Sequence, residues 1–159
     1  MYRYQGCSLP NVFLKNGFEI VSTPYGEGVT IHDLDGLHAA LGEAIVKSKA
    51  PITGYEFRFL RQELGLSQSG MGKYLGFNEQ TVARWEKGKG KRVDPAADRL
   101  LRLVYESAKM GTKKLAPALE RIRALEATLP LNGQESERPS QRKLTAKFDD
   151  GWTSAVAAA

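Results

Sequence analysis

The stretch LGLSQSGMGKYLGFNEQTVARWEKG, residues 64–88, predicts two short helices joined by a tight turn. Ser67 is a favoured N-cap for the first helix, and Gly76, which tolerates a positive φ, ends it. Asn78 then caps the second helix. Four apolar side chains occupy the inward positions of the two helices: Met71, Leu75, Val82 and Trp85. This arrangement indicates a helix-turn-helix.

The second helix directs polar side chains away from that core, and their chemistry suits DNA. The outward set is Glu79, Gln80, Thr81, Ala83 and Arg84. Glutamine and arginine present planar groups that match the edges of adenine and guanine in the major groove. A spacing of four places Gln80 and Arg84 on one helical face, so both reach the same stretch of bases.

The segment resembles the XRE (Cro/cI-type) helix-turn-helix family through Leu64, Leu66, Ser67-Gln68, Gly76, Val82, Arg84-Trp85-Glu86 and Lys87-Gly88. Up to about residue 128, the chain resembles more narrowly the MqsA-like antitoxin and autoregulator proteins, which place a small N-terminal domain before the motif. Their best-known members hold zinc there with two pairs of cysteines, whereas this chain has a single cysteine, Cys7.

The XRE resemblance implies base-reading roles for four residues. Gln80 and Arg84 match the positions that most often read bases in the family. Glu79, at the start of the helix, is placed to accept a hydrogen bond from a cytosine amino group. Thr81 is expected to contact a thymine methyl group or a phosphate.

The resemblance also implies backbone contacts and a brace. Gln68 matches a phosphate-contacting position at the start of the first motif helix. A basic, glycine-containing loop follows the second helix, and it is expected to grip the DNA backbone flexibly through Lys87, Lys89, Lys91 and Arg92. Arg61 and Glu86 match a pair that forms an internal salt bridge in some members. The alternative for Arg61 is an exposed, solvated charge.

The distribution of charge agrees with this assignment. The chain carries a formal net charge of +5, and its three parts differ: residues 1–52 carry −1, residues 53–114 carry +6, and residues 115–159 carry 0. The excess therefore lies in the part that contains the helix-turn-helix, where attraction to phosphates requires it.

The composition indicates a soluble globular protein. The chain has 159 residues, of which 42% are hydrophobic, enough for one ordinary domain or two small ones. No apolar run approaches the roughly 18–20 residues that a membrane span needs, and no secretory signal is evident at the start. We expect a cytoplasmic protein without contact to membranes. With only Cys7, an intramolecular disulfide and a thiolate-rich zinc site are excluded, and a buried thiol is expected.

Residues 1–50 predict a small domain in front of the motif. Apolar runs flank an Asn16-Gly17 pair and a later turn around Gly26, which predicts three antiparallel strands within residues 11–32. Asp35 is the expected N-cap of a following helix. The fold class is thus α+β: a small three-stranded antiparallel β unit plus a helix, followed by an all-α domain.

Residues 53–128 predict a five-helix XRE-type domain. Thr53 and Glu56 have the spacing of a capping box, and Asp94 with Pro95 starts a later helix. The last helix repeats apolar residues at close to 3.5-residue spacing, from Leu115 to Leu129. This pattern is typical of a dimer seam and equally of a helix that covers the core.

Residues 130–159 begin as a polar linker with glycine and proline. Residues 143–148 alternate, so two interpretations remain: a disordered tail, or a short strand that docks on the edge of the N-terminal sheet.

The run from His32 to His38 contains two histidines and two aspartates, which raises a metal or hydrolytic site as an alternative. The spacing is poor, because His32 ends a strand while His38 lies in the next helix. We expect no metal, no cofactor and no enzymatic activity.

The leading hypothesis is a transcriptional regulator that binds double-stranded operator DNA. We expect it to recognise a palindrome as a homodimer and to repress, as the proteins it resembles do. The alternative is an antitoxin whose main role is to bind and neutralise a protein toxin.

Overall fold

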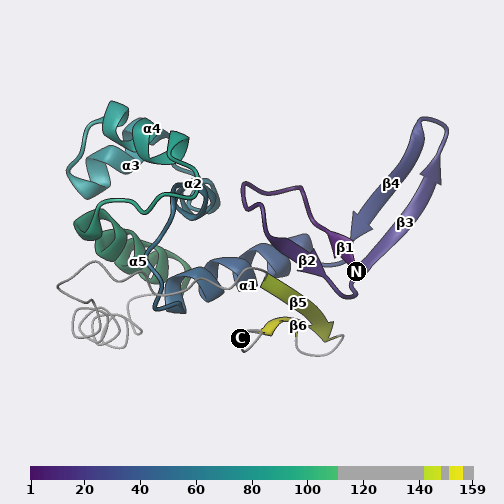
Figure 1. Ribbon diagram of the computed structural model, residues 1–159. Coiled ribbons are helices and arrows are strands. Elements are labelled where there is room, and N and C mark those ends of the chain that lie inside the picture. Colours follow the sequence, from purple (N-terminus) through teal and green to yellow (C-terminus); the bar gives the residue numbers. More distant parts are fainter. Residues whose placement is uncertain (111–141, 148–150, 156–159) are drawn as a thin grey trace. The chain divides into compact units, whose positions relative to one another are not determined.

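The computed structural model describes residues 1–110, 142–147 and 151–155 (Figure 1). The chain divides into two compact units. The first comprises Met1–Ala44 with Pro139–Ala159, and the second comprises Ile45–Arg138. The described strands of the C-terminal tail therefore belong with the N-terminal unit, whereas the sequence alone suggested three consecutive segments.

The first unit contains a four-stranded sheet in the order β1-β2-β5-β6. The bounds of its strands are β1 Tyr2–Arg3, β2 Val12–Leu14, β5 Arg142–Lys147 and β6 Gly151–Ala155. Strands β2 and β5 are parallel, with Leu14 opposite Leu144, and the two outer pairs are antiparallel. Val12, Leu14 and Leu144 are completely buried. Of the two interpretations of the tail, the structure has the docked strand.

The other two strands, β3 (Phe18–Thr23) and β4 (Gly26–Ile31), form a separate antiparallel hairpin. The expected three-stranded unit is therefore wrong, and so is a hairpin turn at Asn16-Gly17. Strand β2 pairs with β1 and β5 instead of β3. Gly17 does adopt a positive φ of 75°, but its carbonyl accepts from the His32 amide and closes the base of the β3–β4 hairpin. A distant strand, β5, took the place that local pairing predicted for β3.

Helix α1 spans Leu34–Lys47. Its N-cap is Asp33, whose carboxylate accepts from the Gly36 amide at 3.0 Å. The expectation that Asp35 is the cap is wrong by two residues. Asp35 instead lies in the first turn, where a negative charge interacts favourably with the helix dipole.

The second unit contains α2 (Gly54–Glu63), α3 (Gln68–Leu75), α4 (Glu79–Lys87) and α5 (Pro95–Met110). The predicted caps are confirmed: the capping box at the start of α2, Ser67 before α3, Asn78 before α4 and Asp94 before α5. Gly76 ends α3 in the left-handed conformation. The α+β class and the helix-turn-helix are thus confirmed. The fifth helix and the Leu115–Leu129 seam lie outside the described residues.

Two glycines allow this domain to pack closely. A Cβ atom on Gly72 of α3 would clash with the carbonyl oxygen of Phe77, and one on Gly54 would clash with that of Trp85. Glycine at these positions brings the start of α2 against the end of α4, and α3 against the turn. Gly70 lies against no backbone atom within contact distance, and nothing in the structure explains it.

Candidate nucleic-acid interface

Helix α4 has one apolar and one polar face. Val82 is completely buried. Trp85 packs its ring edge-on against Phe57 and Phe77, with ring centroids 5.4 and 4.9 Å apart. These contacts occupy Trp85 in the core, so it is held away from bases. They also fix the rotation of α4 about its axis, because turning the helix would expose Val82.

The opposite face of α4 carries the predicted base-reading residues. Glu79, Gln80 and Arg84 are exposed, and Thr81 is half-buried. The Asn78 cap accepts from the Thr81 amide at 2.7 Å, which holds the first turn of the helix together. Gln80 and Arg84 lie four residues apart and present adjacent polar groups on one face. Their side chains are available for bidentate contacts to base edges.

A hydrogen-bond network centred on Arg61 and Glu86 braces α4 against the rest of the domain. The Arg61 guanidinium donates to both Glu86 carboxylate oxygens, from Nε at 2.6 Å and from Nη2 at 2.9 Å. Arg61 also donates from Nη1 to the Leu66 carbonyl at 2.8 Å. The two charged side chains are only 12% and 6% exposed, so solvent screens this pair weakly. The fork therefore joins α2, the α2–α3 loop and α4.

Gln68 belongs to the same network. Its amide nitrogen donates to Glu86 Oε2 at 3.0 Å. The sequence assigned Gln68 only to a phosphate, and the structure adds this internal contact. The amide nitrogen carries two hydrogens, so the side chain has donor capacity beyond the bond to Glu86. Glu86 thereby orients Gln68 as well as Arg61.

The backbone of the basic loop after α4 is hydrogen-bonded to the start of α2 and to the segment before it. The Gly54 amide donates to the Lys91 carbonyl, the Tyr55 amide to the Lys89 carbonyl, and the Val93 amide to the Ile52 carbonyl, each at 3.0 Å. Four cationic side chains of this loop and of the end of α4 remain exposed: Lys87, Lys89, Lys91 and Arg92. The four charges therefore emerge from a backbone that is hydrogen-bonded to the rest of the domain.

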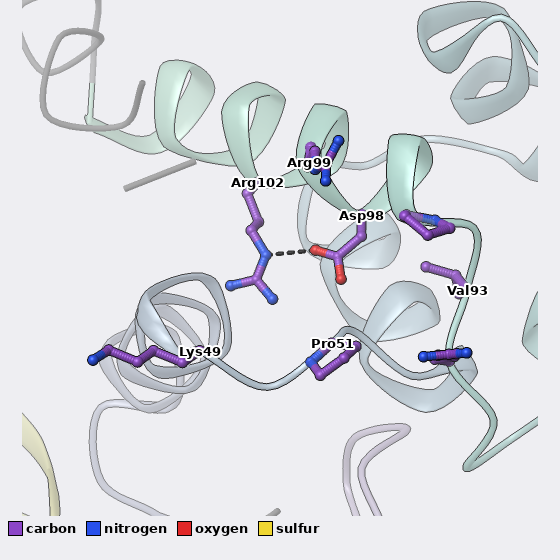
Figure 2. Close-up of a pocket in the computed structure, with 8 residues that line it drawn as sticks. Lys49, Pro51, Val93, Asp98, Arg99 and Arg102 are labelled. Carbon is purple, nitrogen blue, oxygen red and sulfur yellow. Dashed lines mark hydrogen bonds and ion pairs between the residues drawn. The ribbon is translucent and has the colours of Figure 1, made fainter. Parts of the chain in front are cut away.

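Sequence reasoning missed Asp98 and Arg102 of α5, which form a buried ion pair with Nε and Oδ1 2.5 Å apart (Figure 2). Asp98 also accepts from the Ile52 amide at 2.8 Å. Arg102 donates to the carbonyls of Val46, Ser48 and Ala50. The pair fastens the segment before α2 to α5. Its four-residue spacing within an apolar helical stretch was the only signal in the sequence.

The His32–His38 run does not form a joint site. The imidazole of His32 lies 3.2 Å from a Glu19 carboxylate oxygen, whereas that of His38 lies 2.8 Å from the Tyr4 hydroxyl. Asp33 caps α1. Among the described residues, no three His, Cys, Asp or Glu side chains converge in a way that suits a metal.

A family model described as helix-turn-helix matches residues 57–104. No curated protein and no solved structure gives a significant match. The match confirms the helix-turn-helix expected for this segment, which holds α3, α4 and the basic loop, whereas the narrower MqsA-like resemblance is not confirmed. Residues 57–104 therefore form a DNA-binding domain of the kind found in transcription regulators. No helix in the described ranges is long and apolar enough to span a membrane.

Proposed function

We propose that the chain is a repressor that binds a palindromic operator as a homodimer and regulates its own transcription. The observation that carries the proposal is the orientation of Gln80 and Arg84: both are exposed on a helix whose rotation is fixed by Trp85 and by the Arg61–Glu86 fork. Preorganised bidentate groups of this kind discriminate between bases. Repression then follows from occupation of the operator, without catalysis.

Affinity comes mainly from the cationic loop. Each lysine or arginine that neutralises a phosphate releases counterions, so binding is strong at low salt and weakens as salt rises. One helix-turn-helix reads only a short half-site. Two copies related by a two-fold axis, on half-sites about one helical turn apart, supply the contact area that specific binding needs.

We predict that Arg84→Ala weakens binding to the operator by about 1–3 kcal/mol and relaxes specificity at one base pair, because it removes a bidentate base contact. The matched variant is Lys91→Ala, which should weaken binding to all DNA sequences alike. It should also lower the slope of log K against log salt concentration by about 1.

Footprinting on the DNA upstream of the gene identifies the operator. Titrations of operator and random duplexes at several salt concentrations then give the binding free energies and the salt slopes. Equal losses on operator and random DNA for Arg84→Ala would remove its base-reading role. Protection of a single half-site by a monomer would contradict the palindromic, dimeric arrangement.

A second candidate function, neutralisation of a partner protein, is supported by the β3–β4 hairpin. Ile20 and Val29 are paired across the two strands and point to the same face, yet they are 62% and 37% exposed. Tyr25 at the turn is fully exposed. Two-stranded hairpins are marginal in water without further packing, so an exposed apolar face on one is suited to a protein partner.

We predict that Ile20→Lys reduces recovery of such a partner about tenfold when the tagged chain is expressed with its neighbouring genes, because it places a charge in the apolar contact. Thr30→Lys is the control, since residue 30 lies on the other face of the hairpin. DNA affinity should stay unchanged in both. Equal recovery from the two variants would argue against the hairpin as the contact surface.

A further inference from the structure

The second unit contains a pocket between α5 and the two chain segments that approach its first turns (Figure 2). Its walls are mainly apolar. Its lining comes from the segment before α2, the end of the basic loop and the first turns of α5. No part of this pocket overlaps the exposed face of α4, so it is not the base-reading site. It is open to solvent and small, which limits any occupant to a few heavy atoms.

One polar residue of the lining is Arg102, which is only 3% exposed and extends from α5 toward the segment before α2 (Figure 2). Arginine has five N–H donors. In Arg102, Nε donates to Asp98, and Nη1 donates to the carbonyls of Ile45, Val46 and Ser48. Among the described residues, only the Ala50 carbonyl accepts from Nη2. Nη2 carries two N–H groups, so one of them has no acceptor among the described residues.

The charge of the lining favours an anion. Asp98 is neutralised by Arg102 and accepts from the Ile52 amide, so both of its oxygens are engaged. The remaining ionisable side chains of the lining are all cationic: Lys49, Arg92 and Arg99. Lys49 is on the outer rim with its amine directed away from the Asp98–Arg102 pair (Figure 2). The lining therefore combines cationic side chains with the apolar Pro51, Val93 and Pro95.

We propose that this pocket binds a small organic carboxylate, with the acid group on Arg102 and the neighbouring cations and a short apolar body on Pro51, Val93 and Pro95. A carboxylate accepts hydrogen bonds from the N–H groups of a guanidinium when the two groups are coplanar. The apolar part of the lining disfavours an inorganic ion, which keeps its shell of water. The ligand is an effector, because the pocket shares residues with the basic loop.

The link to DNA runs through Arg92 and Val93. Residue 92 forms an antiparallel bridge with Thr53, and the Val93 amide donates to the Ile52 carbonyl. Arg92 is both a pocket residue and one of the cations proposed for phosphate contact. A carboxylate that attracts Arg92 competes with a phosphate, so ligand and DNA weaken each other's binding.

The binding step is tested on the full chain without DNA, by amide chemical shifts during titration with butyrate. We expect shifts at Val93, Asp98 and Arg99 that saturate with a Kd of about 1–10 mM, as suits a ligand of so few atoms. Butyramide has the same shape without the charge, and inorganic phosphate has charge without the apolar body. Both should bind at least about tenfold more weakly. Equal binding of either would overturn the proposal.

Two variants locate the site. Arg99→Gln and the exposed Lys49→Gln should each weaken butyrate binding about threefold to tenfold, because each removes one cation from the rim. Lys109→Gln is the control: it removes an exposed cation from the same helix, about 15 Å further along its axis. Equal losses in all three variants would show general charge attraction and overturn the assignment to this pocket.

The effect of the ligand on DNA binding is tested in a separate experiment. Only this experiment depends on the proposed function. Replacing chloride by butyrate at constant ionic strength should raise the Kd for the operator about fivefold, while butyramide has no effect. If butyrate binds at the pocket and the operator Kd does not change, the site stands and the effector role is overturned. If the chain does not bind DNA at all, the proposed function fails and the titration still decides the pocket.

Discussion

Arg102→Ala is expected to lower the free energy of unfolding of the second unit by about 3–5 kcal/mol, because it breaks a buried ion pair and leaves one charge uncompensated. Asp98 loses its cation, and the carbonyls of Val46, Ser48 and Ala50 lose their donor. Arg102→Lys should recover only part of this loss. A lysine restores the charge but reaches fewer acceptors than the planar fork.

Urea denaturation followed by tryptophan fluorescence measures this loss. The chain contains two tryptophans, so a Trp152→Phe background makes Trp85 the only reporter and assigns the transition to the second unit. Arg58→Ala is the control, since Arg58 is exposed, and it should change stability by no more than about 0.5 kcal/mol. A loss below about 1 kcal/mol for Arg102→Ala would mean that the pair does not hold the segment before α2.

Glu86→Ala is expected to cost about 3 kcal/mol in unfolding free energy and to weaken operator binding as well. It leaves Arg61, a side chain only 12% exposed, without its counter-ion, and it releases Gln68. Glu86→Gln keeps one oxygen acceptor and should lose about half as much. The effect on DNA follows because the fork holds the recognition helix in position.

The same fluorescence assay measures stability, and operator titrations of the folded variants measure affinity. Glu79→Ala is the matched control for stability, because it removes an exposed acid from the same helix and should stay within about 0.5 kcal/mol of the parent. If Glu86→Ala loses no more unfolding free energy than Glu79→Ala, the Arg61–Glu86 pair makes no net contribution to stability. The proposal that this pair braces α4 would then be wrong.

The helix-turn-helix was predictable because its signals are local. A cap such as Ser67 or Asn78 acts on amides two or three residues away, and Gly76 adopts its own left-handed conformation. The spacing of Val82 and Trp85 likewise determines which face of α4 points inward. The pairing of Arg61 with Glu86 is not local, and it was suggested only by resemblance to a family.

The β unit could not be derived in the same way. An Asn-Gly pair favours a hairpin between neighbouring strands, yet β2 pairs with β5 from more than a hundred residues further along the chain. Turn residues such as Asn-Gly indicate only where the chain prefers to bend. They contain no information on which other strand will compete for a free edge.

The sequence by itself determined helix α4, its cap, its polar face and the positive charge of the segment that contains it, because each depends on residue types within one or two helical turns. The tertiary structure alone decided what holds that helix in place and what lies beside it. Arg102 meets backbone carbonyls more than fifty residues away, and the loop Lys89–Val93 is tied to Ile52–Tyr55. Such contacts form only when the chain folds back on itself, so no local pattern encodes them.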